Sequence, residues 1–213
     1  MFEGSCLVVV YSPAGLGYKG FADRLSIACH PKKRKGQKTG SDPAGAGGGR
    51  EEVMLRLERI VSGGQTGADQ AALDIAMEFG IPHGGWVPKG RKTESGPLPA
   101  GYVVKEMPTD SYPKRTERNV MDSDGTLIIS HGELSEGSEY TRMMAAKHGK
   151  PWIHIDADKH SIEAAVERIR TWISGNDIET LNVAGPPASK DPYIYAATKT
   201  ILEAVLLSTY EDG

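Results

Sequence analysis

The feature that most constrains the fold is a short apolar run that ends in a glycine-rich turn and leads into a helix pattern. Ile60 and Val61 end the run, residues 62–67 form the turn, and apolar residues then recur at helical spacing from Ala71 to Phe79. A strand, a glycine turn and a helix in this order direct backbone N–H groups and a helix N-terminus toward an anion. The segment therefore predicts a strand–turn–helix unit that binds a phosphate or another anion.

All six residues of this turn are candidate ligand contacts. Its glycines allow close approach of the backbone to a phosphate and permit positive φ angles. The turn lacks both the G-x-G-x-x-G frame of a dinucleotide site and the Gly-Lys-Ser/Thr ending of a P-loop, so an ordinary tight turn is the alternative. The candidates are Ser62, Gly63, Gly64, Gln65, Thr66 and Gly67.

From Met54 onward, apolar strand-like runs alternate with helix patterns. This alternation predicts an α/β fold with a mainly parallel sheet and helices on both faces. Strands are expected to end at Val61 and to span 126–129, 152–155 and 181–184, with a short edge strand within 102–107. Helices are expected from 71 to about 80, over 112–121, up to Lys147, after an N-cap at Ser161, and over the last apolar stripe from 194 to 205.

Two further polar, glycine-containing loops follow predicted strands. Ligands of parallel α/β sheets bind beyond the C-terminal ends of the strands, so three such loops at one edge predict a binding crevice. The candidates from the second and third loops are Ser130, Gly137, Ser138, Gly185 and Ser189.

Basic side chains in two other segments are candidate phosphate ligands. The Gly- and Pro-rich loop 84–99 carries Lys89 and Arg91, which face either a ligand or the solvent. Arg115 and Asn119 are four residues apart on one helix face and present a guanidinium and an amide together. Pairing of Arg115 with a nearby acid is the alternative.

Residues 1–53 differ in composition from the rest of the chain. They contain a basic run at 31–38 and a Gly-, Ala- and Pro-dominated stretch at 41–49. We therefore expect a largely disordered extension, or a non-native segment if translation starts at Met54, ahead of one domain at 54–213. A nuclear-localisation role for the basic run is less favoured than a solvated charge run.

Bulk properties limit the partners. The net charge of −3 argues against nucleic-acid binding, and no apolar run is long enough to cross a membrane. Both cysteines, Cys6 and Cys29, precede the predicted domain and form no metal or redox motif. This composition suits a reducing, cytoplasmic setting. Homo-oligomer formation stays open.

Several segments together resemble the circularly permuted YpsA-like branch of the SLOG superfamily, whose members are often labelled molybdenum carriers. The similar segments are Ser62-Gly-Gly-Gln-Thr-Gly-Ala-Asp69, Gly84-Gly85, Pro88-Lys-Gly-Arg91, Arg115-Thr116, Asn119-Val120, Asp122-Ser-Asp124 and Leu181-Asn-Val-Ala-Gly-Pro186 with Ser189. The resemblance covers about 56–208. It implies a Rossmann-like three-layer fold and a pocket for a nucleotide or a nucleotide-derived ligand, with the molybdenum cofactor as one candidate.

The chain departs from that branch at two loops and lacks the signature of related phosphoribohydrolases. Glu136 replaces a usual glycine, and Pro187 stands where an arginine usually follows Gly-Pro. The signature Pro-Gly-Gly-x-Gly-Thr-x-x-Glu is not reproduced, so the candidate acid–base groups are Asp69 and Glu139. Asp69 has a simpler explanation, because an acid in the first turn of a helix is favoured by the helix dipole.

Three functions are compatible with these residues. The first is a carrier or sensor that binds a nucleotide-like ligand. The second is an enzyme that hydrolyses the N-glycosidic bond of a nucleoside monophosphate, and the third is an interaction domain with a vestigial pocket. The group around His154 and Asp156 has no metal-ligand spacing, so we expect a polar strand end rather than a metal site.

A chain truncated to begin at Met54 should fold as well as the full-length chain. The extension carries too little apolar surface to contribute to a core. Thermal unfolding of the two chains should give the same midpoint. A clearly lower midpoint for the shorter chain would show that residues 1–53 pack against the domain.

Overall fold

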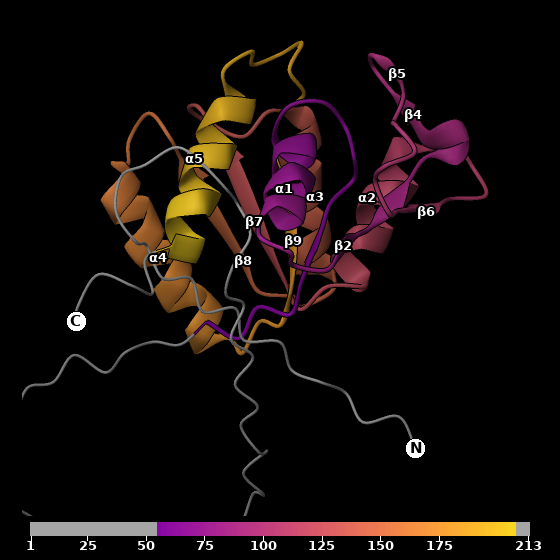
Figure 1. Ribbon diagram of the computed structural model, residues 1–213. Helices are drawn as coiled ribbons and strands as arrows, with labels where there is room; N and C mark the ends of the chain where they lie inside the picture. Colours follow the sequence, from indigo (N-terminus) through magenta and orange to yellow (C-terminus); the bar gives the residue numbers. More distant parts are fainter. Residues whose placement is uncertain (1–54, 208–213) are drawn as a thin grey trace, which may run out of the picture. The chain divides into compact units, whose positions relative to one another are not determined.

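Five parallel strands form the central sheet of the computed structural model, which describes residues 55–207 (Figure 1). The order across the sheet is β2-β1-β9-β7-β8, and every neighbouring pair is parallel. These strands are β1 (Arg59–Val61), β2 (His83–Gly84), β7 (Gly125–Ser130), β8 (Trp152–Asp156) and β9 (Thr180–Ala184). The α/β fold with a parallel sheet is confirmed.

The last strand of the chain lies in the middle of the sheet. β9 pairs with β1 on one side and with β7 on the other. If the strands are counted from β9, the order across the sheet becomes 3-2-1-4-5, which is that of a Rossmann fold. The chain therefore has a Rossmann-like sheet whose first strand and helix have moved to the C-terminal end.

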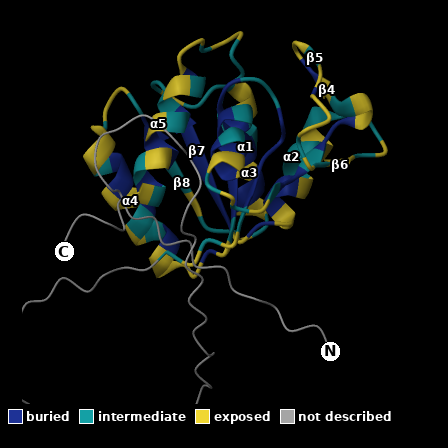
Figure 2. Ribbon diagram, viewed as in Figure 1, coloured by how far each residue is buried: buried dark blue, intermediate teal, exposed yellow. Residues whose placement is uncertain are grey.

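Helices cover both faces of this sheet and make three layers. Figure 1 shows α1 and α5 in front of the sheet and α3 behind it. α4 packs beside α5, and α2 packs beside α3. The helices are α1 (Ala68–Glu78), α2 (Tyr112–Met121), α3 (Glu136–Lys147), α4 (Ile162–Gly175) and α5 (Ile194–Leu207). The sheet and the inward helix faces form the buried core, as Figure 2 shows.

Local sequence signals set the helix ends. The Ser111 and Ser161 side chains accept hydrogen bonds from the backbone N–H groups of Lys114 and Ala164, which caps α2 and α4. Gly80 and Gly149 follow α1 and α3 with φ angles of 65° and 62°. Glycine adopts this left-handed conformation without steric cost, so both helices stop where the sequence predicts.

The Gly- and Pro-rich region between α1 and α2 contains more structure than the sequence predicts. His83 and Gly84 form β2 at the edge of the main sheet, a strand that the sequence did not predict and that includes the first residue of the expected loop 84–99. The strand expected within 102–107 is β6 (Lys105–Glu106), which pairs with β3 (Trp86–Val87) in a separate two-stranded sheet. β4 (Lys92–Thr93) and β5 (Gly96–Pro97) form a hairpin after the 3₁₀ turn Lys89–Arg91. Strands of two residues are too short to show any periodicity.

Residues 1–54 lie outside the part that the structure describes, and so do Cys6 and Cys29. The predicted disordered or non-native extension at 1–53 and the domain start at Met54 therefore stay predictions. Within 55–207, no helix has the length and apolar character that spanning a membrane requires.

Gly185→Ala should lower the free energy of unfolding by about 1–3 kcal/mol, the usual cost of overpacking. A Cβ at this position would lie 2.4 Å from the Ile129 carbonyl oxygen and 2.6 Å from the Ala68 Cβ, neither of which can swing aside. Gly175→Ala is the control, since it lies in α4 with no atom within 4 Å of an added Cβ. Urea unfolding of both variants tests this; equal stabilities would contradict the tight contact at Gly185.

Candidate functional site

The turn after β1 lies directly against the loop after β9. The Ser62 hydroxyl donates a hydrogen bond of 2.6 Å to the Val183 carbonyl oxygen. Gly67 has a φ of 83°, and a Cβ there would lie 2.7 Å from the Pro186 carbonyl oxygen. These contacts bring together two of the three loops that the sequence predicts at one edge. Gly64 also has a positive φ, 70°, but a Cβ there would meet Leu98 at 2.8 Å, so it faces the apolar core.

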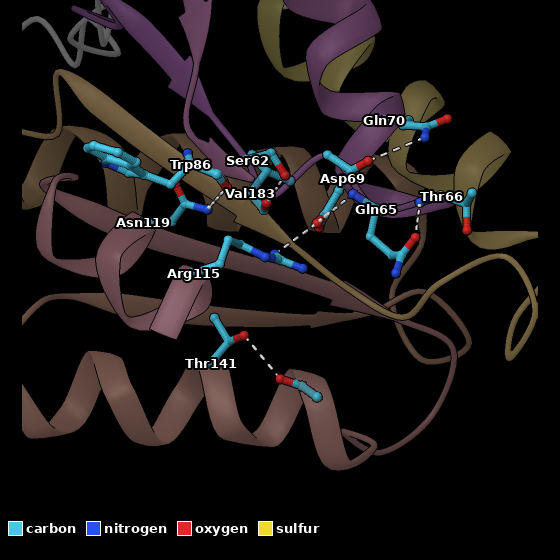
Figure 3. A network of polar contacts seen from close by, with 12 residues as sticks. Ser62, Gln65, Thr66, Asp69, Gln70, Trp86, Arg115, Asn119, Thr141 and Val183 are labelled. Atoms are coloured by element: carbon cyan, nitrogen blue, oxygen red, sulfur yellow. Dashed lines mark hydrogen bonds and ion pairs between the residues drawn. The ribbon is translucent and has the colours of Figure 1, made fainter. Parts of the chain in front are cut away.

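Arg115 and Asp69 meet in the crevice at the C-terminal edge of the sheet (Figure 3). Nη1 of Arg115 lies 3.3 Å from Oδ2 of Asp69, and the two side chains are only 12% and 6% exposed. The guanidinium covers Gly63, where a Cβ would lie 1.5 Å from Nη1. Only glycine at position 63 leaves room for this buried ion pair.

A small cavity adjoins this ion pair. Its volume is about 10 Å³, which is close to the space that one water molecule needs. Nε of Arg115 is buried and has no hydrogen-bond partner among the described residues. The cavity is lined by Gly63, Asp69, Arg115, Thr116, Asn119, Thr141, Asn182, Val183 and Ala184.

Burial controls the ionisation of Asp69. Removal from water raises the pKa of its carboxyl above the ordinary value. Arg115 and the backbone N–H of Gln65, at 3.2 Å, act in the opposite direction. A buried carboxyl with a raised pKa beside a cation is the type of group that acid–base catalysis uses, so Asp69 stays the better placed of the two candidates.

Glu139, the second candidate acid, pairs with its neighbour on α3. The Arg142 guanidinium donates two hydrogen bonds to its carboxylate, at 2.8 and 2.6 Å, and these bonds lower the pKa of Glu139. Glu139 is not among the residues that line the cavity. The substituted Glu136 also stays out of the crevice, because its side chain is 95% exposed and lies 3.7 Å from Lys190.

Of the four polar side chains predicted between 84 and 121, only Arg115 brings a charge to the crevice. Lys89 is exposed at the 3₁₀ turn. The Arg91 guanidinium donates to the carbonyl oxygens of Leu98, Pro99 and Tyr102, which ties its own loop together. Asn119 lines the cavity, but its amide bonds the backbone of Trp86 at 2.7 and 3.0 Å.

The loop after β7 contributes one unpaired polar group. The Ser138 hydroxyl, on α3, is buried and has no hydrogen-bond partner among the described residues. Ser130 instead uses its hydroxyl on Gly132 and His154, at 2.9 and 2.8 Å. Gly137 is exposed in the first turn of α3. Ser138 is therefore the residue of this loop with an unused donor.

The polar strand end at β8 has a structural role. Oδ1 of Asp156 accepts hydrogen bonds from the N–H groups of Gly132 and Asp158, at 2.8 and 3.1 Å. Although burial opposes it, these bonds and Lys159 hold the pKa of Asp156 at about 2. Within 55–207, no cluster of three or more His, Cys, Asp or Glu is placed to hold a metal ion.

A second polar cluster joins three loops that are far apart in the sequence. The hydroxyls of Thr66 and Ser189 both donate to the carboxylate of Glu94, in the β4–β5 hairpin. The Ser189 N–H donates to the same carboxylate at 3.0 Å. Although partial burial opposes it, these bonds hold the pKa of Glu94 below its usual range. Thr66 and Ser189 were predicted ligand contacts, and here they bind a carboxylate of the chain itself.

Sequence reasoning missed several residues of these clusters. Thr141 and Asn182 line the cavity, and Asn182 donates to Thr126 at 3.2 Å. Asn182 is polar within an otherwise apolar strand, which is a signal that could have been used. Glu94 gave no signal, because nothing in its loop predicts that the hairpin reaches the loop after β9.

Comparisons with known proteins agree with this architecture. The circularly permutated YpsA SLOG family matches residues 60–206. The crystal structure of the "putative molybdenum carrier protein" from Syntrophus aciditrophicus SB is similar, with 55% sequence identity and a TM-score of 0.71. The match covers 71% of this chain and 96% of that protein.

One more solved structure matches weakly. (E)-4-Hydroxy-3-methyl-but-2-enyl diphosphate reductase is 12% identical, with a TM-score of 0.31, over 69% of this chain and 59% of that one. The search of curated proteins found no match.

Arg115→Met should lower the free energy of unfolding by about 3–5 kcal/mol at pH 8, because it leaves the Asp69 carboxylate buried without its cation. The loss should be smaller at pH 5. A carboxyl whose folded-state pKa is raised favours folding only while it is protonated, so stability falls as pH rises through that pKa.

Denaturant unfolding at both pH values tests this prediction. The double variant Asp69→Asn, Arg115→Met is the control and should recover much of the loss, because no buried charge then lacks a partner. A pH-independent loss would contradict the coupling of the two side chains.

Proposed function

We propose a ligand-binding function for this chain, which belongs to the circularly permutated YpsA SLOG family. The ligand is a nucleotide or a nucleotide-derived molecule, bound at the C-terminal edge of the sheet, and the protein acts as its carrier or sensor. The molybdenum cofactor is one candidate, since the similar Syntrophus protein is named a molybdenum carrier. A reducing, cytoplasmic setting belongs to the same proposal.

The observation that carries this proposal is the buried Arg115 guanidinium. Its Nε has no hydrogen-bond partner among residues 55–207, and its Nη1 makes a contact of 3.3 Å with Asp69, which is long for an ion-paired hydrogen bond. A planar guanidinium with unused donors suits a phosphate group, which it can bind through two parallel bonds. The Ser138 hydroxyl is a second buried donor without a partner among residues 55–207, and it lies on α3, the helix whose Thr141 lines the cavity.

The donor set suits the phosphate end of the ligand. A phosphate supplies the acceptors that Arg115 and Ser138 lack, and these residues would hold the phosphate of either a nucleotide or the molybdenum cofactor. The cavity has room for about one water molecule, so ligand binding requires the Arg115 side chain to move. Because Gly63 has no side chain, it does not obstruct this movement of the Arg115 guanidinium.

The environment of Asp69 supports a second candidate function, the hydrolysis of the N-glycosidic bond of a nucleoside monophosphate. The raised pKa of Asp69 and its contact with Arg115 support a role as the proton donor beside the proposed phosphate ligand. Release of the free base by the parent protein, and its loss in Asp69→Asn, would establish this reaction. A protein that binds no member of the nucleotide series would instead support the vestigial pocket.

Binding should be measured by calorimetry with a series of nucleoside monophosphates, followed by chromatography of the same mixtures. We expect at least one nucleotide to bind and to be recovered intact. Gly63→Ala should weaken that binding at least about tenfold, because its Cβ displaces the guanidinium that the phosphate requires.

Gly101→Ala is the matched control, since no atom lies within 4 Å of an added Cβ. Gly64→Val is not suitable, because its side chain would meet Leu98 and Val87 in the core. Equal nucleotide affinities in Gly63→Ala and the parent would refute the role of Arg115.

A further inference from the structure

The cluster around Glu94 is built like a binding site for an anion. Two hydroxyls and one backbone N–H converge on the carboxylate, from Thr66 and from Ser189. The Thr66 hydroxyl oxygen also accepts the Ala188 N–H at 3.2 Å, which fixes its position. We call the donors of Thr66 and Ser189 the anion seat.

The anion seat lies where a Rossmann-like sheet binds phosphate. Thr66 precedes α1 in the turn after β1, and Ser189 lies in the loop after β9. Counted from β9, that loop is the first strand-to-helix connection, which holds the phosphates of dinucleotides in the ordinary fold. Two of the three loops at the ligand-binding edge thus direct their donors at one carboxylate.

Glu94 is not required there to neutralise a buried charge. Its side chain and that of Ser189 are exposed, so solvent could satisfy these donors. The hairpin that carries Glu94 is held together internally, because the Thr93 hydroxyl donates to the Gly96 carbonyl oxygen at 2.6 Å. It is docked to the turn after β1 by its Glu94 N–H, which donates to the Gln65 side chain at 2.9 Å. The contacts of Glu94 with Gln65, Thr66 and Ser189 are all polar, so the tip of the hairpin can move away while Leu98, the next residue after β5, stays buried.

We propose that the anion seat binds the phosphate group of a ligand and that Glu94 fills it as an internal competitor until the ligand displaces the hairpin. This inference rests on the proposed function, because the donors of Thr66 and Ser189 would bind oxygens of the same phosphate group that Arg115 binds, from the loops after β1 and β9. A carboxylate and a phosphate carry like charges and need the same donors, so they cannot share the seat. The hairpin is thus a built-in gate that reduces affinity for phosphate-bearing ligands.

The test compares affinities for AMP, adenosine and inorganic phosphate, measured by calorimetry on the full-length chain. Glu94→Ala should bind AMP and inorganic phosphate about tenfold more tightly than the parent, because each vacated charge-assisted bond becomes available to phosphate. Glu94→Gln should show a smaller gain, since it removes the charge but keeps an acceptor. Adenosine, which has no phosphate, should bind Glu94→Ala and the parent with equal affinity.

Two further variants distinguish binding at the anion seat from a general effect of removing a negative charge. Glu203→Gln changes the same charge at an exposed position of α5 and should match the parent. Ser189→Ala in the Glu94→Ala background should remove the gain, because it deletes a donor of the seat. Circular dichroism and the unfolding midpoint of each variant confirm that it is folded.

The outcomes distinguish this inference from the proposed function. Unchanged phosphate and AMP affinities in Glu94→Ala, or an equal gain for adenosine, would overturn the anion seat even if nucleotides bind the parent. A gain for inorganic phosphate without any binding of AMP would support the seat and refute the nucleotide proposal. A lower unfolding midpoint with no gain in affinity would mean that Glu94 only stabilises the contact between the hairpin and the two loops.

Discussion

The parallel pairing of β1 with β9 is the interaction on which the site depends. It places Ile60 beside Leu181 and Val61 beside Asn182, although the two strands lie near opposite ends of the domain's sequence. Because both strands point the same way, their following loops emerge at one edge, where Ser62 bonds Val183. The Arg115–Asp69 pair and the Glu94 cluster both rely on this contact. Permutation changed where the chain begins but kept the central position that a first strand has in a Rossmann fold.

Two charge arrangements of different kinds meet at this edge. Arg115 and Asp69 are buried together, so each side chain makes the burial of the other tolerable and neither can be removed alone without a large loss. Glu94 is exposed, and its hydrogen bonds add little to stability that water could not replace. The first arrangement therefore fixes the shape of the crevice. The second can open at low cost, which is what a ligand-operated gate requires.

Carrier and hydrolase need much of the same site. Both must bind a phosphate with a cation and backbone donors, and under either proposal Arg115 and the loops after β1 and β9 would supply them. The hydrolase needs, in addition, one acid–base group beside the bond that it cleaves. Asp69 is buried, has a raised pKa and contacts Arg115, whereas Glu139 is engaged by Arg142 on the surface of α3. The hydrolase proposal therefore requires the glycosidic bond of the ligand to lie beside Asp69, and the carrier proposal does not.

The sequence by itself determined the alternation of strands and helices, the helix ends at Ser161 and the glycines, and the glycine turn after β1. These features depend on neighbouring residues, whose spacing and capping chemistry are visible in one dimension. The tertiary structure alone decided that β9 lies at the centre, that the Asn119 amide bonds the backbone of Trp86, and that Glu94 reaches Thr66 and Ser189. Such contacts join residues far apart in the chain, and no local pattern encodes which strands or loops will meet.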